Sequence, residues 1–253
     1  MISEQEISNL ANKYKIDRFT ILREYLQIVF LRELYYYPES QNIYFKGGTS
    51  IHLFLGSFRF SEDLDFTSTI QIRHLLGLLT KIEKNMQLDI AGIKLNKVNQ
   101  KNNSLTARLN YYVKEINFPI TIKLEFSLRE KPLTKKITIL ETDYPVVPYP
   151  LVVHLFWEEI LAEKIRALLT RAKGRDLFDL WFLLSKNVKI DEGMVNKKMK
   201  FYNKKFSYDK LIKKIERFDE KEISVDLNRF LPTTHRQFVK DLKNLTLEKL
   251  NKP

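Results

Sequence analysis

Hydrophobic residues in the first part of the chain recur at the spacing of an amphipathic helix. The residues that would share one face of a helix over 18–37 are Leu22, Leu26, Val29 and Phe30. Asp17 stands directly before this segment, where its carboxylate can cap the first helical turn. A shorter helix is predicted over 3–13, because Ser3 and Glu6 have the spacing of a capping box.

From residue 42 the pattern changes to short apolar runs with a period of two, which is typical of strands. The segments predicted as strands are 42–45, 62–67, 88–98, 104–114, 119–127 and 136–141. The apolar run 49–55 predicts a short helix that ends at Gly56, a residue suited to a helix C-terminus. A further amphipathic helix is predicted over 70–86. Together these elements predict a small mixed sheet of about five strands.

A cluster of three prolines between residues 145 and 150 predicts a linker. After residue 152 every apolar repeat has helical spacing. The expected fold class is therefore α+β. Residues 1–144 would hold the N-terminal helices and the α/β core, and residues 145–253 would form a helical domain that closes a cleft.

The composition is that of an ordinary globular protein, with 44% hydrophobic and 29% charged residues among 253. Cysteine is absent, which excludes disulfides, thiolate zinc sites and thiol nucleophiles. No segment has the length and apolarity of a membrane span. The first ten residues carry acids where a signal peptide would carry a basic region. We expect a cytoplasmic protein with no membrane partner.

The net charge of +12 favours an anionic partner. From residue 194 onward, 16 Lys and Arg stand against 8 Asp and Glu, so two thirds of the excess lies there. One interpretation is a solvated lysine-rich helical surface, and the other is a surface that binds nucleic acid. The lysines that would form it, beside aromatic residues, are Lys197, Lys198, Lys200, Lys204 and Lys205.

Two aspartates, Asp63 and Asp65, lie two residues apart in a predicted strand and therefore point to the same face. Like charges at this separation repel each other and resist shared burial. Arginine or lysine partners would relieve the repulsion in a purely structural pair. A divalent cation is the other remedy, and Mg²⁺ is commonly held by one or two carboxylates together with substrate phosphates.

A third acid comes from the strand predicted over 119–127. Its alternation puts the apolar residues on one face and presents Glu125 on the other, beside Lys123. Three acids from two neighbouring strands can hold two metal ions about 4 Å apart, an arrangement that clamps both oxygens of an in-line phosphoryl displacement.

The adjacent glycines Gly47 and Gly48 end one predicted strand and open a helix. Free backbone N–H groups and the helix dipole favour phosphate at such a place, although a glycine pair alone is only a turn. Ser50 and Ser61 supply hydroxyls nearby, and Arg59 supplies a cation. The order of glycine turn, short helix and Asp-x-Asp strand favours the phosphate-binding interpretation.

The stretch KGGTSIHLFLGSFRFSEDLDF, residues 46–66, resembles the signature of the DNA polymerase β-like nucleotidyltransferase superfamily. More closely, it resembles the AbiEii/AbiGii family of toxin nucleotidyltransferases, which is related to the MenT-type toxins. The segment EEILAEKIRALLTRAKGRDLFDLWFLL, residues 158–184, is similar to the second hallmark of that family, and IKLEFS supplies the third acid. The resemblance covers about residues 40–185.

This resemblance implies roles for individual residues. Catalytic roles fall on Asp63, Asp65, Glu125, Lys164 and Asp176, and the first three would also bind the metal. The residues implied to bind the nucleotide are Lys46, Gly47, Gly48, Thr49, Ser50, Arg59, Ser61, Lys123 and Arg171. Glu125 departs from the aspartate of many superfamily members, but a longer acid still binds metal. Two roles stay open for Asp176, one in the wall of the cleft and one in the chemistry.

The function that the resemblance implies is a nucleotidyltransferase that moves a nucleoside monophosphate from an NTP to an acceptor hydroxyl. Mg²⁺, with Mn²⁺ as the alternative, would be the cofactor. The enzyme would be the toxin of a toxin–antitoxin or abortive-infection system, with an antitoxin protein as partner and RNA, such as tRNA, as acceptor. The alternatives are transfer to a protein or small molecule, and a nucleotide-binding module without turnover. The complete set of three acids argues against the module.

Overall fold

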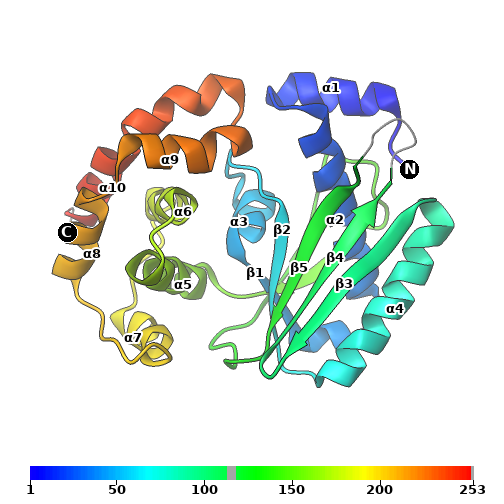
Figure 1. The fold of residues 1–253 in the computed structure, drawn as a ribbon, viewed down its shortest axis with the longest axis horizontal. Coiled ribbons are helices and arrows are strands. Elements are labelled where there is room, and N and C mark those ends of the chain that lie inside the picture. Colours follow the sequence, from blue (N-terminus) through cyan, green and yellow to red (C-terminus); the bar gives the residue numbers. More distant parts are fainter. Residues whose placement is uncertain (113–117, 252–253) are drawn as a thin grey trace. The chain divides into compact units, whose positions relative to one another are not determined.

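The computed structural model describes residues 1–112 and 118–251 (Figure 1). The chain divides into two compact units. The first unit comprises residues 1–56 and 60–155, and the second comprises Ser57–Arg59 together with the chain from Phe156 onward. The proline-rich segment that was predicted to begin the second domain is thus part of the first unit.

The first unit begins with the two predicted helices, α1 (Glu4–Tyr14) and α2 (Arg18–Tyr36). Ser3 and Glu6 form the complete capping box in front of α1. Asp17 caps α2 by accepting a hydrogen bond from the backbone N–H of Thr20 at 2.9 Å. The helix predictions for this region are confirmed, because local capping chemistry and the apolar repeat specify the same boundaries.

The remaining elements of the first unit form a seven-stranded mixed sheet with the order β3-β4-β5-β2-β1-β7-β6. They are η1 (Pro38–Asn42), β1 (Ile43–Lys46), α3 (Gly47–Leu55), β2 (Asp63–Ser68), α4 (Ile72–Asp89), β3 (Ile93–Lys101), β4 (Ser104–Tyr111), β5 (Ile120–Ser127), β6 (Lys136–Ile139) and β7 (Leu151–His154). β2 pairs in parallel with β5, and β1 pairs in parallel with β7, whereas the other neighbours are antiparallel. The α+β fold class predicted from the sequence is confirmed.

Two strands, β3 and β4, differ from the prediction by three residues or more at an end. The strand expected from residue 88 begins only at Ile93, because α4 continues through Asp89 with Met86 still on its buried side. The strand expected over 104–114 ends at Tyr111, and residues 113 and 114 of that prediction lie outside the described residues.

The prediction of helix throughout the chain after residue 152 was wrong for β7. Its four residues are too few to display a strand period, and Pro150 stands directly before them. The strand is specified by its neighbours instead, since Phe45 of β1 is in register with His154 and Ile137 of β6 with Val153. The strand predicted over 136–141 is present as β6, so β7 is the unpredicted strand of the seven in the sheet, where about five were expected.

One face of the sheet carries the core of the first unit. The helices α2 and α4 pack against it (Figure 1). Phe66 of β2 stacks on Phe126 of β5 with ring centroids 4.7 Å apart, and the ring of Phe30 from α2 lies 6.4 Å from Phe66. Because side chains alternate along a strand, the residues between these positions point to the opposite face.

The second unit is helical throughout its described part. Its elements are α5 (Trp157–Thr170), α6 (Gly174–Ser185), α7 (Glu192–Lys200), α8 (Tyr208–Glu216), α9 (Glu220–Leu227), η2 (Asn228–Phe230), η3 (Thr233–Lys240) and α10 (Leu242–Leu250). In neither unit does a described helix combine the length and the apolarity that crossing a membrane requires.

Lys198 corrects the interpretation of the lysine run as one continuous surface. It lies on the inner face of α7, where its residue is only 2% exposed. Its Nζ donates to Glu159 Oε1 at 2.7 Å and to Glu163 Oε1 at 3.1 Å, so it joins α7 to α5. Val195 and Met199 are buried beside it on the same helix. Lys198 therefore has a structural role and cannot contact a bound nucleic acid.

We predict that Lys198→Met destabilises the protein by about 3–5 kcal/mol, because it leaves two buried carboxylates without their cation. The measurement is the free energy of unfolding in urea. The matched control is Lys197→Met, since Lys197 is exposed on the same helix, and its effect should stay within about 0.5 kcal/mol. Equal stability of the two variants would contradict the role assigned to this buried cluster.

Candidate functional site

Three acids and a lysine lie side by side on two neighbouring strands. β2 and β5 run parallel in a register that sets Asp63 beside Lys123 and Asp65 beside Glu125. Leu64 and the other intervening residues belong to the buried face, so these four side chains lie on the face opposite α2 and α4. Asp63, Asp65 and Glu125 are half-buried, and Lys123 is exposed.

The electrostatics of this group are set by close opposite charges. Lys123 Nζ donates to Glu125 Oε2 at 2.5 Å. Burial by itself would raise the pKa of Glu125, but the hydrogen bond and charge of Lys123, with the charge of Lys46, hold that pKa below its ordinary value. Burial would likewise lower the pKa of Lys123, yet Glu125, Asp63 and Asp65 together raise it. Lys123 thus lies in the electrostatic field of all three acids.

The three acids suit a divalent cation by charge and by donor type. Carboxylate oxygens are the ligands that Mg²⁺ and Mn²⁺ prefer. The ammonium of Lys123 shows that positive charge is stabilised at this face, because all three acids raise its pKa. In the described part of the chain, no three His, Asp or Glu side chains are already gathered as a metal site. Binding of an ion would therefore require the side chains of these strands to converge.

The glycine turn is in direct steric contact with the acids. Gly47 begins α3 immediately after β1 and has φ +83°, a conformation that favours glycine. A Cβ at this position would overlap the carboxylate of Asp65. Lys46, the residue before it, is in register with Asp65 across the β1–β2 pair. Position 47 therefore favours glycine for two reasons, which are its backbone conformation and the proximity of Asp65.

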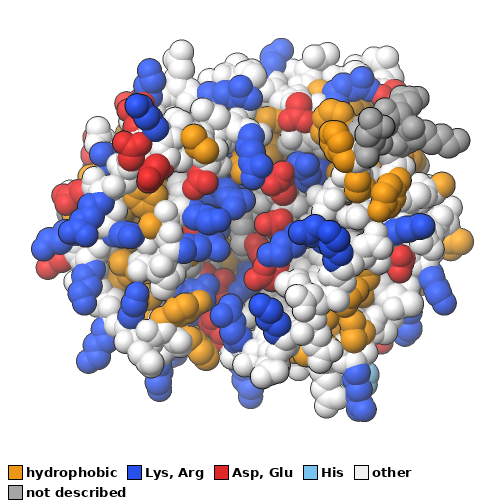
Figure 2. Space-filling view, in the orientation of Figure 1, with side chains coloured by type: hydrophobic (Ala, Val, Ile, Leu, Met, Phe, Trp, Pro, Cys, Tyr) orange, Lys and Arg blue, Asp and Glu red, His pale blue; other side chains and the backbone are white. Residues whose placement is uncertain are grey.

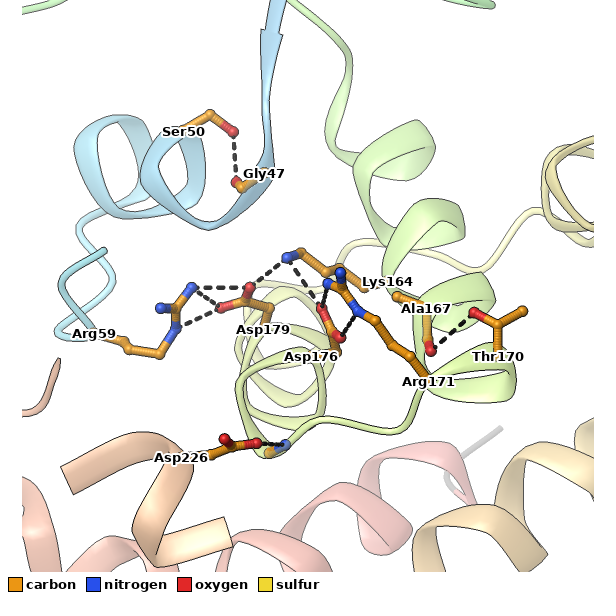
Figure 3. Close-up of polar contacts among 11 residues, drawn as sticks. Gly47, Ser50, Arg59, Lys164, Ala167, Thr170, Arg171, Asp176, Asp179 and Asp226 are labelled. Carbon is orange, nitrogen blue, oxygen red and sulfur yellow. Dashed lines mark hydrogen bonds and ion pairs between the residues drawn. The ribbon is translucent and has the colours of Figure 1, made fainter. Parts of the chain in front are cut away.

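The hydroxyls of the first turn of α3 hold this turn in place. Ser50 Oγ donates to the carbonyl oxygen of Gly47 at 2.8 Å (Figure 3). Thr49 Oγ1 donates to the carbonyl oxygen of Asp63. Both side chains are buried, as is Gly48 between the turn and the helix. They attach the glycine turn to the first acid of β2, so the turn and the acids form one rigid arrangement.

Ser61, another predicted nucleotide contact, precedes β2 and is half-buried. Its carbonyl oxygen accepts a hydrogen bond from Gln27 Nε2 of α2 at 3.0 Å. The backbone at Ser61 is thereby fixed to α2, while no hydrogen bond described here defines the direction of its hydroxyl.

The second unit contains a buried network of ion pairs around Asp179 (Figure 3). Arg59 is 2% exposed and binds Asp179 in a bidentate manner, with Nε 2.9 Å from Oδ1 and Nη2 3.0 Å from Oδ2. Lys164 Nζ lies 2.7 Å from Asp179 Oδ2 and 3.5 Å from Asp176 Oδ1. Asp179 thus joins α6 to Lys164 of α5 and to the Ser57–Arg59 segment, which belongs to this unit.

Asp176 is the second buried acid of the network. Arg171 donates to it twice, from Nε to Oδ2 at 2.8 Å and from Nη2 to Oδ1 at 2.9 Å. Burial would raise the pKa of Asp176, but the charges of Lys164 and Arg171 outweigh it and lower that pKa. Burial would lower the pKa of Lys164, which Asp179 and Asp176 raise instead. Asp176 is therefore an ionised carboxylate that orients two cations.

The structure thus separates the predicted site residues into two groups. Those from the Asp-x-Asp, glycine-turn and third-acid motifs lie in the first unit, and Arg59, Lys164, Arg171 and Asp176 lie in the second. Asp179 was given no role from the sequence, although it accepts hydrogen bonds or ion pairs from two of the predicted cations. The sequence did contain one indication of this role. Asp179 follows Asp176 by three residues in a helix, and residues at this spacing share a face.

One protein-family model matches most of the chain. The family model described as "Nucleotidyl transferase AbiEii toxin, Type IV TA system" matches residues 29–247. This match covers the acid strands, the glycine turn and the buried network of the second unit. No curated protein sequence matches the chain.

Solved structures show the same fold. MenT4, a nucleotidyltransferase toxin (Rv2826c) from Mycobacterium tuberculosis H37Rv, has a TM-score of 0.65 at 18% identity, covering 100% of this chain and 91% of that one. JHP933 from Helicobacter pylori has a TM-score of 0.58 at 23% identity, covering 93% of each chain. With the family match over most of its length, this chain belongs to the AbiEii family of nucleotidyl transferase toxins of type IV toxin–antitoxin systems.

Proposed function

We propose that this toxin nucleotidyltransferase transfers a nucleoside monophosphate from an NTP to a hydroxyl of an RNA acceptor, with tRNA as the favoured class, in a Mg²⁺-dependent reaction. Mn²⁺ is the alternative ion. The observation that carries the proposal is the register of β2 and β5, which sets Asp65 beside Glu125 and Asp63 two residues away on the same face. A glycine turn adjoins them, and a Cβ at Gly47 would overlap the carboxylate of Asp65.

Asp63, Asp65 and Glu125 are the residues that would hold the metal. When bound, the ion supplies positive charge for the triphosphate and for the attacking hydroxyl. The chain's own contribution is to fix three carboxylates on a rigid sheet, where their shared face makes positive charge favourable. Lys123, which now donates to Glu125, would turn to the triphosphate.

The glycine turn would bind the triphosphate. The N–H groups at the start of α3, from Gly47, Gly48, Thr49 and Ser50, lie at the positive end of the helix dipole. Lys46 adds a cation at the same strand end, and its charge lowers the pKa of Glu125. Ser61 would contribute its hydroxyl from the segment before Asp63.

In the second unit, Arg171 and Lys164 are the proposed nucleotide contacts. The side chain of Arg171 is 58% exposed even though it binds Asp176, so its outer nitrogen atoms can reach a phosphate. Lys164 and Arg59 are held by Asp179. We propose that Asp176 and Asp179 position these cations, because both are buried acids paired with them; of the two roles considered for Asp176, this is the structural one.

RNA is proposed as the acceptor because the second unit carries most of the excess positive charge. The antitoxin of the same system is the proposed protein partner, and the cytoplasm is the proposed site of action. Transfer to a protein or a small molecule is the competing outcome. Incubation with each labelled NTP, Mg²⁺ and total RNA separates them, because the label appears on RNA, on protein or on neither.

Asp65→Asn should reduce transfer at least roughly 100-fold, because it removes one carboxylate charge from the proposed metal site. Its melting temperature should stay equal or rise, since a like-charge neighbour of Asp63 is lost. Label incorporation and thermal unfolding are measured on the same preparation.

The control for this variant is Glu39→Gln, which removes an exposed acid of η1 in the same unit and should retain full transfer. Full transfer by the folded Asp65→Asn enzyme in Mg²⁺ would contradict the metal-binding role of Asp65.

Gly47→Ala should weaken NTP binding and destabilise the first unit, because the new Cβ overlaps Asp65 and alanine is strained at φ +83°. Gly77→Ala is the control. Gly77 lies in α4 with open space around a Cβ, so this change should stabilise the protein by about 0.5–1 kcal/mol. Calorimetric titration with NTP and urea unfolding provide the measurements.

A double variant tests the steric part of this interpretation. Gly47→Ala combined with Asp65→Ala removes the clash, so it should recover part of the lost stability without recovering transfer. If Gly47→Ala binds NTP with the affinity of the wild type, the glycine turn has no role in triphosphate binding.

A further inference from the structure

A pocket in the second unit is lined by four lysines together with an asparagine and two apolar residues. Its volume is about 420 Å³, and its lining residues are Leu169, Met199, Asn203, Lys204, Lys205, Lys210 and Lys214. Pockets of this size accommodate small ligands. The lining residues come from α5, from α7 and the turn after it, and from α8. Lys210 and Lys214 are four residues apart, so they lie on the same side of α8.

Among the residues that the structure describes, the four ammonium groups have no ion-pair partner. Throughout residues 1–112 and 118–251, no carboxylate lies within ion-pair distance of them. Lys204, Lys205 and Lys210 are exposed, and Lys214 is half-buried. The contrast with Lys198 is informative, because that lysine is fully neutralised by two glutamates in the same unit. Four uncompensated cations around one hollow favour a ligand with more than one negative charge.

The turn that carries two of these lysines is held in a defined conformation. Asn203 has φ +53° in the turn that follows α7, and the N–H of Lys204 donates back to the carbonyl oxygen of Met199 at 3.3 Å. Asn196 Oδ1 accepts from the N–H of Phe206 at 3.0 Å, which anchors the far end of the turn to α7. Lys204 and Lys205 therefore project from a fixed backbone.

The apolar part of the pocket lining indicates which class of anionic ligand fits the pocket. Leu169 is half-buried and offers apolar surface in the pocket lining, whereas Met199 is 1% exposed and contributes little. A free phosphate would leave this surface unused. A ribose or a base would cover it, with flanking phosphates on the lysines and the Asn203 amide available to a polar edge. A nucleotide within a single strand therefore fits both parts of the pocket.

Lysine and arginine side chains also surround the region of α7 and α8 on the left of Figure 2, which gives an RNA strand cationic surface beyond the pocket. We propose that this lysine pocket binds one nucleotide of single-stranded RNA and so docks the acceptor. The proposal rests on the proposed function only for the identity of the RNA as acceptor, since RNA binding itself is measured independently of transfer.

The test measures binding of a fluorescein-labelled single-stranded 12-mer RNA to the full chain by anisotropy, between 50 and 200 mM KCl. The pocket variant Lys204→Gln/Lys210→Gln should bind more weakly, and its plot of log affinity against log salt should be flatter by about 1.4, because two phosphate contacts are lost. This corresponds to roughly a sevenfold smaller loss of affinity across that salt range. A second pair, Lys205→Gln/Lys214→Gln, should behave in the same way.

The matched control is Lys197→Gln/Lys200→Gln, which removes two exposed lysines of α7 that do not line the pocket. Its salt slope should stay close to that of the wild type. Equal slopes for the pocket and control variants would overturn the proposal, because the lysines would then act only as general surface charge. A wild-type chain that fails to bind the RNA would overturn it as well.

Two further measurements separate this proposal from the proposed function. NTP affinity, measured by calorimetry without RNA, should be unchanged in the pocket variants, and its loss would assign the pocket to the nucleotide substrate instead. In transfer assays the pocket variants should raise the KM for RNA and keep kcat. If the wild type labels no RNA with any NTP, the proposed reaction fails, while the binding data still decide the pocket.

Discussion

The parallel pairing of β2 and β5 is the constraint on which the site depends. It sets Phe66 beside Phe126 on one face and Asp65 beside Glu125 on the other, so the same register produces the core and the acid cluster. Burial of each aromatic ring contributes about 1.5–3 kcal/mol. This stabilisation from the buried rings holds the carboxylates of Asp65 and Glu125 side by side, although their like charges repel each other. A shift by one residue would bury the acids and expose the rings.

In the second unit, buried acids hold cationic side chains in place. Asp179 and Asp176 are almost completely buried, and each is satisfied by side chains of opposite charge. A buried ion pair is a weak source of stability, but it fixes orientation, because breaking it leaves an uncompensated charge. Arg59, Lys164 and Arg171 are thereby held with little freedom. Charge thus has a different effect in each unit. In the first unit three neighbouring acids favour the binding of a cation, and in the second unit two buried acids fix the positions of cationic side chains.

The sequence predicted those features that depend on local chemistry or on a strong period. The capping box of α1, the Asp17 cap, the Gly56 helix end and the shared face of Asp63 and Asp65 are such features. It did not predict β7, because four residues show no period and the pairing with β1 and β6 is non-local. It also missed the burial of Lys198 and the role of Asp179, since ion pairs between helices depend on packing that periodicity does not encode.

The contact between position 47 and Asp65 has an evolutionary consequence. A side chain at position 47 would contact the carboxylate at position 65 and would also have to adopt the backbone conformation at φ +83°. A lineage that loses the acid is relieved of the first constraint and not of the second, so glycine should outlast the acid. Among homologues, a substituted glycine should therefore occur only in chains that have already lost the acid of this face.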